Sequence, residues 1–83
     1  MNLLFDVTRV LATDDYKLAL EFENGECRVF NMQPYLAKPP FGPLNELAIF
    51  KLARVENGTV TWPGNLDFAP ETLYDKSTPV DVN

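Results

Sequence analysis

The sequence contains no histidine and only one cysteine, Cys27. Histidine is the commonest metal ligand and the usual general base near neutral pH, so catalytic and metal sites lack their most frequent residue. A single cysteine forms no internal disulfide and supplies no zinc site. We therefore expect no metal site, no cofactor and no enzymatic activity.

Glycine and basic residues are also few and dispersed. The four glycines stand singly, at positions 25, 42, 58 and 64, so there is no glycine-rich loop of the kind that binds phosphates. The 12 acidic and 7 basic residues give a net charge of -5. This charge repels nucleic acid and anionic lipid, and it suits a basic partner protein. We expect no direct binding of nucleic acid.

Long hydrophobic runs are missing as well. The apolar start, MNLLFDVTRVL, is interrupted by Asp6 and Arg9 before it reaches the length of a signal-peptide core. No other stretch is long enough to cross a bilayer. We expect a cytoplasmic protein without membrane attachment, built as a single compact domain over residues 1–78, with a frayed tail at residues 79–83.

What the sequence does contain is two hairpin signals, the first in YKLALEFENGECRVFNM. The dipeptide Asn24-Gly25 favours a two-residue type I′ turn, which places Phe22 opposite Cys27. Phe30 then lies as an apolar spot on the more polar face, and Cys27 is a packed structural cysteine rather than a nucleophile. The inward row in this register is Leu18, Leu20, Phe22, Cys27 and Val29.

The second hairpin signal is KLARVENGTVTW, again with an Asn-Gly pair, at positions 57 and 58. A type I′ turn there sets Val55 opposite Val60 and Ala53 opposite Trp62. A further strand is predicted upstream, ending near Ala12.

Four prolines break up the segment between the hairpins, NMQPYLAKPPFGPLNELAIF. They exclude a central strand or a long helix, so we expect a crossover that packs on the sheet, with at most a helical turn at residues 44–48. Pro70 and Glu71 are typical of the start of a helix, predicted here over residues 70–76. The fold class is therefore α+β: a small antiparallel β-sheet built from hairpins, with a Pro-rich crossover and a short C-terminal helix.

Trp62 and Asp67 are the most conspicuous candidates for a binding site. Trp62 is either a core anchor, which is the favoured interpretation, or an interface residue that contributes strongly to binding. Asp67, with Asn65 and Glu71, lacks the spacing of a calcium loop. The favoured interpretation is that Asp67 or Asn65 hydrogen-bonds the backbone of the turn or the start of the helix.

Two further surfaces are candidates. A pocket between the crossover and the sheet, lined by Tyr35, Phe41 and Trp62, would hold a small ligand. Phe30 is a candidate contact on the first hairpin. The strand that ends at Ala12 contains no proline, so its edge is open to a second copy of the chain or to a strand from a partner.

Three segments carry a family resemblance: VTRVLATDDYKLALEFENGECRVFNM, PLNELAIFKLARV and NGTVTWPGNLDFAPETLYDKS. Through them the sequence resembles the bacterial family called domain of unknown function 2442. The resemblance implies a compact α+β fold with an antiparallel sheet and short helical pieces, and it supplies no activity. It also implies that relatives occur alone, fused to a helix-turn-helix segment, or encoded beside another small protein in an arrangement that looks like a toxin–antitoxin pair.

We therefore expect a non-enzymatic protein-interaction module, the acidic partner of a small basic protein in a toxin–antitoxin-like pair. The alternative is a small-ligand sensor that uses the pocket between crossover and sheet. An enzyme ranks third, because no set of catalytic residues is present.

Overall fold

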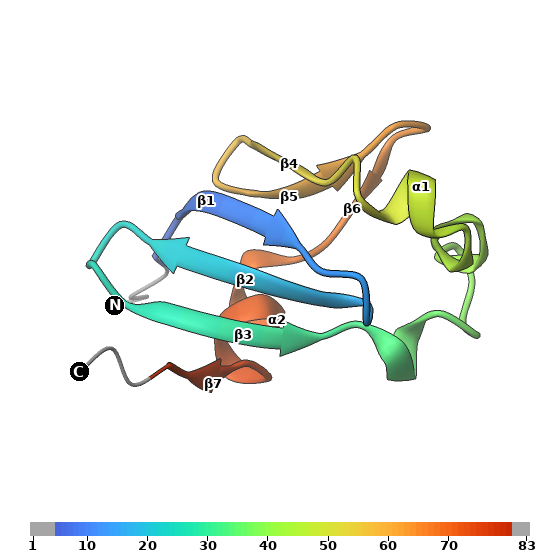
Figure 1. Ribbon diagram of the computed structural model, residues 1–83. Coiled ribbons are helices and arrows are strands. Elements are labelled where there is room, and N and C mark those ends of the chain that lie inside the picture. The colour runs from blue at the N-terminus through green and yellow to red at the C-terminus, as the bar shows by residue number, and fades with distance from the viewer. Residues whose placement is uncertain (1–4, 81–83) are drawn as a thin grey trace.

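The computed structural model describes residues 5–80. Within this range the chain forms two antiparallel sheets joined by short helical segments (Figure 1). Sheet A, in strand order β1-β2-β3-β7, contains β1 (Val7–Ala12), β2 (Lys17–Phe22), β3 (Cys27–Asn31) and β7 (Thr78–Pro79). Sheet B, in strand order β4-β5-β6, contains β4 (Arg54–Glu56), β5 (Thr59–Trp62) and β6 (Leu66–Asp67). The predicted α+β class with antiparallel hairpins is confirmed, and the hairpins divide between the two sheets.

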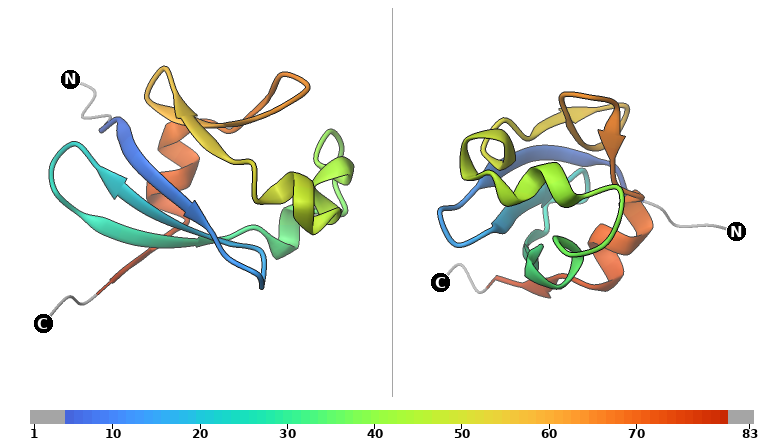
Figure 2. Two further views of the ribbon diagram at one scale, coloured as in Figure 1. Left: turned by 45° about the horizontal axis from the view of Figure 1, so that its top comes forward. Right: turned by 90° about the vertical axis from the view of Figure 1, so that its right-hand side faces the viewer.

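Helical segments connect the sheets and cover one face of sheet A. Between β3 and β4 lie η1 (Gln33–Tyr35), η2 (Gly42–Asn45) and α1 (Leu47–Phe50). Helix α2 (Pro70–Asp75) begins at Pro70, as predicted, and buries Leu73. Figures 1 and 2 show α2 on one face of sheet A, the inner face, while no helix or strand of residues 5–80 crosses the opposite, outer face. Among residues 5–80 there is no helix long and apolar enough to cross a membrane.

The first hairpin, β2–β3, has a different register from the predicted one. Leu20 pairs with Arg28, whereas the predicted register places it opposite Val29. The turn closes where the N–H of Phe22 donates to the carbonyl of Glu26 (2.9 Å), so residues 23–25 form the loop. In this loop only Gly25 has a positive φ, 89°, whereas a type I′ turn requires two such residues. The predicted register was therefore wrong by one residue.

This shift reverses the two faces of β3. Phe30, which we expected on the polar face, is only 1% exposed and lies in the core, while Cys27 and Val29 lie half-buried on the outer face. The physical reason is tertiary. Phe30 packs edge-on against Phe68, with ring centroids 5.1 Å apart, and Arg28 turns inward with it to meet hydrogen-bonding partners.

The second hairpin, β4–β5, has the predicted register, with Val55 opposite Val60. Asn57 and Gly58 both have positive φ, 52° and 77°, as a type I′ turn requires. The expected continuation to Ala53 is not formed, because β4 begins one residue later.

Strand β1 has the predicted end and lies at one edge of sheet A. A bulge after Val7 lets Val7, Val10 and Ala12 all turn toward the core, whereas Leu11 faces outward. The N–H of Val7 donates to the carbonyl of Gly58 (2.8 Å). The start of this edge is therefore joined to the second hairpin and is not free to pair with a partner strand.

The last strand, β7, was not predicted. Pro79 pairs with Arg28, and the N–H of Val80 donates to the carbonyl of Cys27 (2.9 Å). Pro79 and Val80, which we placed in a frayed tail, thus extend sheet A beyond β3. Residues 81–83 of the same tail lie outside the described residues. The buried hydrophobic residues of the described chain form one core.

Candidate functional site

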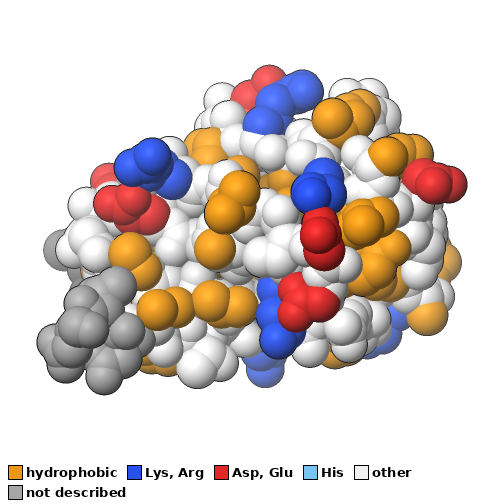
Figure 3. All heavy atoms as spheres, viewed as in Figure 1, with side chains coloured by type: hydrophobic (Ala, Val, Ile, Leu, Met, Phe, Trp, Pro, Cys, Tyr) orange, Lys and Arg blue, Asp and Glu red, His pale blue; other side chains and the backbone are white. Residues whose placement is uncertain are grey.

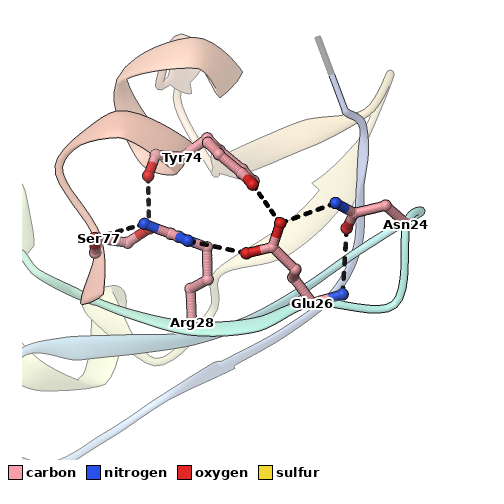
Figure 4. A network of polar contacts seen from close by, with 5 residues as sticks. All are labelled: Asn24, Glu26, Arg28, Tyr74 and Ser77. Carbon is pink, nitrogen blue, oxygen red and sulfur yellow. Dashed lines mark hydrogen bonds and ion pairs between the residues drawn. The ribbon is translucent and has the colours of Figure 1, made fainter. Parts of the chain in front are cut away.

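A polar network joins α2 and β7 to β3 (Figure 4). Arg28 donates from Nη1 to Glu26 Oε1 (2.9 Å), from Nε to Ser77 Oγ (2.6 Å) and from Nη2 to the Ser77 carbonyl (2.9 Å). Its guanidinium also lies over the ring of Tyr74, 4.4 Å from the centroid. The Tyr74 hydroxyl donates to Glu26 Oε2, and Asn24 Nδ2 donates to the same oxygen (2.8 Å).

These hydrogen bonds shift two pKa values in opposite directions. The pKa of Glu26 lies below its ordinary value. The main cause is the hydrogen bond from the Tyr74 hydroxyl, and the second is the hydrogen bond from the Asn24 amide. The same bond to Glu26 raises the pKa of Tyr74. The network therefore favours the ionised form of Glu26 and the protonated form of Tyr74. We conclude that the network anchors α2 to sheet A.

The outer face of sheet A carries a row of apolar side chains. We use the term outer face for Leu11, Ala19, Cys27, Val29 and Val80. Strand pairing aligns Leu11 with Ala19 and Ala19 with Val29, and Val80 lies beside Cys27. Leu11 is 68% exposed and Val80 is 38% exposed. The face is hollowed by about 490 Å³, and Figure 3 shows hydrophobic side chains gathered there.

Charged side chains at the rim of the outer face occur as pairs of opposite sign. Arg9 lies 3.9 Å from Glu21, and Lys17 lies 3.6 Å from Asp15. The Thr13 hydroxyl donates to Asp15, and this is the main cause that lowers the pKa of Asp15. Exposed pairs of this kind add little stability. The pair of Arg9 with Glu21 places balanced charge beside the apolar row.

A second hollow lies on sheet B, on the face turned away from the core. Its volume is about 220 Å³, and Glu56, Asn57 and residues 63–65 are among the residues that line it. Strand pairing places Arg54 beside Thr61 and Thr61 beside Asp67, so these three side chains form one row across the sheet. The Thr61 hydroxyl oxygen is buried and has no hydrogen-bonding partner among the described residues. We call this feature the sheet B hollow.

Trp62, the first residue singled out from the sequence, is a core residue. It is 1% exposed, and its Nε1–H donates to the carbonyl of Phe50 (2.9 Å). The two rings stack with centroids 6.2 Å apart. Its side chain therefore has both its apolar surface and its polar atom satisfied within the chain, as the core-anchor interpretation requires.

Asp67 is exposed at the end of β6 and lines the sheet B hollow. Helix α2 has Ala69 as its N-cap residue, without a side-chain cap, so neither Asp67 nor Asn65 caps the start of this helix. The alternative bond to the backbone of the turn stays a prediction. The chain reaches the helix through a strand pair, Thr61 with Asp67, that leaves the carboxylate facing solvent. No cluster of acidic residues suited to a metal ion occurs in the described part of the chain.

Phe30, Tyr35 and Phe41 meet at Phe68, in the space between the crossover and the sheets. Ring centroids lie 5.1 Å apart for Phe30 and Phe68, 5.2 Å for Tyr35 and Phe68, and 5.1 Å for Phe41 and Phe68. Trp62 packs separately, on Phe50. The residues expected to line one ligand pocket thus fall into two groups, and in the first group aromatic rings fill the space.

Comparison with known protein families matches residues 7–79 to a family described as protein of unknown function (DUF2442). The chain belongs to this family. The match runs from the first residue of β1 to the last of β7, so the DUF2442 domain includes both sheets and nearly all of the outer face and the sheet B hollow. No curated protein and no solved structure matches the chain. The family description assigns no activity, and the two surfaces must be judged on their chemistry.

In this DUF2442 domain, sequence reasoning missed the outer face, and in the sheet B hollow it singled out Asp67 and Asn65 but not Thr61. Leu11 and Val29 share a face only in the observed register, so the type I′ assumption hid the outer face. Phe68 was missed although its spacing to Leu73, across Ala69 and Pro70, is typical of a hydrophobic staple at a helix start. No local signal marks Thr61, because its neighbours in the hollow come from other strands.

Proposed function

We propose that this protein is a non-enzymatic module that binds another protein through the outer face of sheet A. The observation that carries the proposal is the exposed apolar row on that face, in which Leu11 is 68% exposed. Contiguous apolar surface of this kind marks interaction sites in folded proteins. The pairing of Leu11, Ala19 and Val29 makes the row continuous across three strands.

The partner that best fits is a small basic protein with apolar side chains at its contact surface. The net charge of -5 attracts a basic partner and accelerates its association. The balanced rim pairs, such as Arg9 with Glu21, leave the apolar row itself free of repulsion. In its finer form, the proposal makes the chain the acidic member of a bacterial, cytoplasmic pair that resembles a toxin–antitoxin pair.

A capture experiment with matched variants tests this proposal. Tagged protein is used to recover partners from native lysate, alongside Leu11→Glu and the control Leu52→Glu. Leu52 is 54% exposed but does not line the hollow of the outer face. We expect stoichiometric recovery of one basic protein by the natural chain and by Leu52→Glu, and none by Leu11→Glu.

Three results contradict the proposal in different ways. Recovery of no stoichiometric partner by any chain would argue against an interaction module. Equal recovery by Leu11→Glu would place binding elsewhere on the molecule. Light scattering that shows a dimer of the purified chain, abolished by Leu11→Glu, would make the occupant of the outer face a second copy.

The alternative function, a small-ligand sensor, gains no support from Tyr35, Phe41 and Trp62, because their rings pack in two separate groups.

A further inference from the structure

The tripeptide Glu-Asn-Gly occurs twice in the chain, at residues 23–25 and 56–58. In this tripeptide the backbone nitrogen of glycine can attack the side-chain amide of asparagine and close a cyclic imide, because glycine has no side chain to obstruct the approach. The two copies share the residues that set this local reactivity. A difference in reactivity between them must therefore come from the fold.

The first copy is held by hydrogen bonds at both reacting groups. Asn24 Nδ2 donates to Glu26 Oε2 (2.8 Å), and Asn24 Oδ1 accepts from the N–H of Glu26 (3.1 Å). The N–H of Gly25 donates to the carbonyl of Phe22 (2.9 Å). The attacking nitrogen and the amide under attack each have partners, and these bonds must break before the two groups can meet.

The second copy lacks these bonds. Pairing of Glu56 with Thr59 leaves Asn57 and Gly58 as the two central residues of the turn, and Asn57 is exposed. Among residues 5–80, no hydrogen bond involves the Asn57 side chain or the N–H of Gly58. The Asn57 amide can therefore rotate toward the Gly58 nitrogen once the turn opens locally, which costs far less than global unfolding.

We propose that Asn57 is a site of spontaneous deamidation in the folded protein and that Asn24 is protected. The Gly58 nitrogen bonds to Cγ of Asn57 while the Cγ–Nδ2 bond breaks, and the proton of the Gly58 N–H leaves with the amide nitrogen as ammonia. Water then cleaves the imide. Cleavage between this nitrogen and Cγ gives aspartate, and cleavage between the nitrogen and the original backbone carbonyl carbon gives isoaspartate. This modification is independent of the proposed protein interaction.

The modified turn lies where the second hairpin meets β1. The Gly58 carbonyl accepts from the N–H of Val7 (2.8 Å), and the Asp6 carboxylate packs against Gly58, since a Cβ there would lie 2.6 Å from Asp6 Cγ. Isoaspartate adds a carbon atom to the main chain of this turn. Both products add a negative charge to a turn that already contains Glu56 and contacts Asp6. Deamidation therefore loosens the contact with β1 and lowers the melting temperature.

The test is peptide mapping of the full chain after incubation in mildly alkaline buffer. Samples taken over time are digested at acidic pH, and mass spectrometry detects the mass gained when the amide NH₂ is replaced by a hydroxyl. We expect Asn57 to convert about tenfold or more faster than Asn24, because Asn24 must first break its hydrogen bonds. In guanidinium chloride the two rates should become similar, because the two tripeptides are identical.

Three results would overturn the assignment of the site. Asn24 converting as fast as Asn57 in the folded chain would show that the hydrogen bonds give no protection. Conversion at neither residue, over a period in which the unfolded chain is fully converted, would show that the second turn is protected as well. The same excess of Asn57 over Asn24 in the unfolded chain would assign the difference to the sequence.

Asn57→Gly tests the structural consequence, because a Gly-Gly pair also forms a type I′ turn but has no side-chain amide. During incubation the melting temperature of the natural chain should fall as the converted fraction at Asn57 rises. Asn57→Gly should keep its initial melting temperature, whereas the control Asn24→Gly should decline like the natural chain. A converted natural chain with an unchanged melting temperature, or an equal decline in Asn57→Gly, would contradict the loosening of the contact with β1.

Discussion

The two Asn-Gly hairpins contain the same dipeptide and form different turns. Asn57 and Gly58 both adopt positive φ in a two-residue turn, whereas in the first hairpin only Gly25 does, and the loop spans residues 23–25. The dipeptide permits the type I′ turn without requiring it. What decides between the two turns is the set of side chains that each register buries.

In the second hairpin the short turn suits the core, because it sets Val55 against Val60. In the first hairpin the same turn would have directed Cys27 and Val29 inward and Phe30 outward. The longer loop buries Phe30 and turns Arg28 toward Ser77 instead. The apolar outer face depends in part on this choice, since two of its five residues, Cys27 and Val29, are ones that the other register would have buried.

The largest expected effect is the difference in unfolding free energy between two truncations on β3, Phe30→Ala and Val29→Ala. Phe30→Ala should lower the free energy of unfolding by about 3–5 kcal/mol, because it leaves a cavity in the core. Val29→Ala should cost about 1 kcal/mol or less, because Val29 is half-buried on the outer face. Urea denaturation measures both values.

The reverse order, with Val29→Ala costing more, would support the two-residue turn in the first hairpin. If Phe30→Ala does not fold, Phe30→Leu provides the comparison, and it should still be less stable than Val29→Ala.

An intermediate effect is expected from alanine at the two turn glycines. Both have positive φ, so each substitution should cost about 1–2 kcal/mol in backbone strain. Gly58→Ala should cost more than Gly25→Ala, because a Cβ at Gly58 would lie 2.6 Å from Cγ of Asp6, whereas a Cβ at Gly25 meets nothing within 4 Å. Thermal unfolding of both variants tests this order.

A double variant identifies the cause of that difference. Adding Asp6→Ala should recover part of the loss in Gly58→Ala and none of the loss in Gly25→Ala. Additive costs in both backgrounds would show that the Asp6 side chain is not what opposes a Cβ at Gly58.

The smallest effect concerns the pH dependence of stability. Because the pKa of Glu26 is lowered in the folded state, its contribution is present above the ordinary value of 4.5 and is lost as the pH falls through the lowered folded value. Tyr74→Phe removes the main cause of this lowering. We expect its stability to fall less steeply with decreasing pH below 4.5 than that of the natural chain, measured as urea midpoints across a pH series.

Tyr16→Phe is the matched control, because the Tyr16 hydroxyl donates to the backbone carbonyl of Asn45 (2.5 Å) instead of to a carboxylate. Its loss of stability should be the same at every pH. Parallel pH profiles for Tyr74→Phe and the natural chain would show that the bond to Glu26 contributes nothing to acid sensitivity.

Local signals predicted the elements whose boundaries depend on nearby residues. The start of α2 follows from Pro70, and the second hairpin follows from Asn57-Gly58 with matching valines on both sides. Features that depend on distant residues could not be predicted. Strand β7 forms because Ser77 bonds to Arg28 from 49 positions away, and nothing in Thr78 or Pro79 signals a strand.

The candidate surfaces were harder to predict for the same reason. Asp67 was singled out with a backbone hydrogen bond as its favoured role, and its place beside Thr61 emerges only from the pairing of β5 with β6. The outer face required the register of the first hairpin, which depends on the core position of Phe30. An isolated dipeptide contains none of this information.

The most direct test of the register is the pattern of NOEs between α protons of β2 and β3. In an antiparallel pair these protons are closest at the non-hydrogen-bonded positions. The observed register places Glu21 opposite Cys27 and Ala19 opposite Val29 at such positions. Strong α-proton NOEs for these two pairs are predicted. Strong NOEs between Leu20 and Val29 instead would contradict the account and, with it, the existence of the apolar outer face.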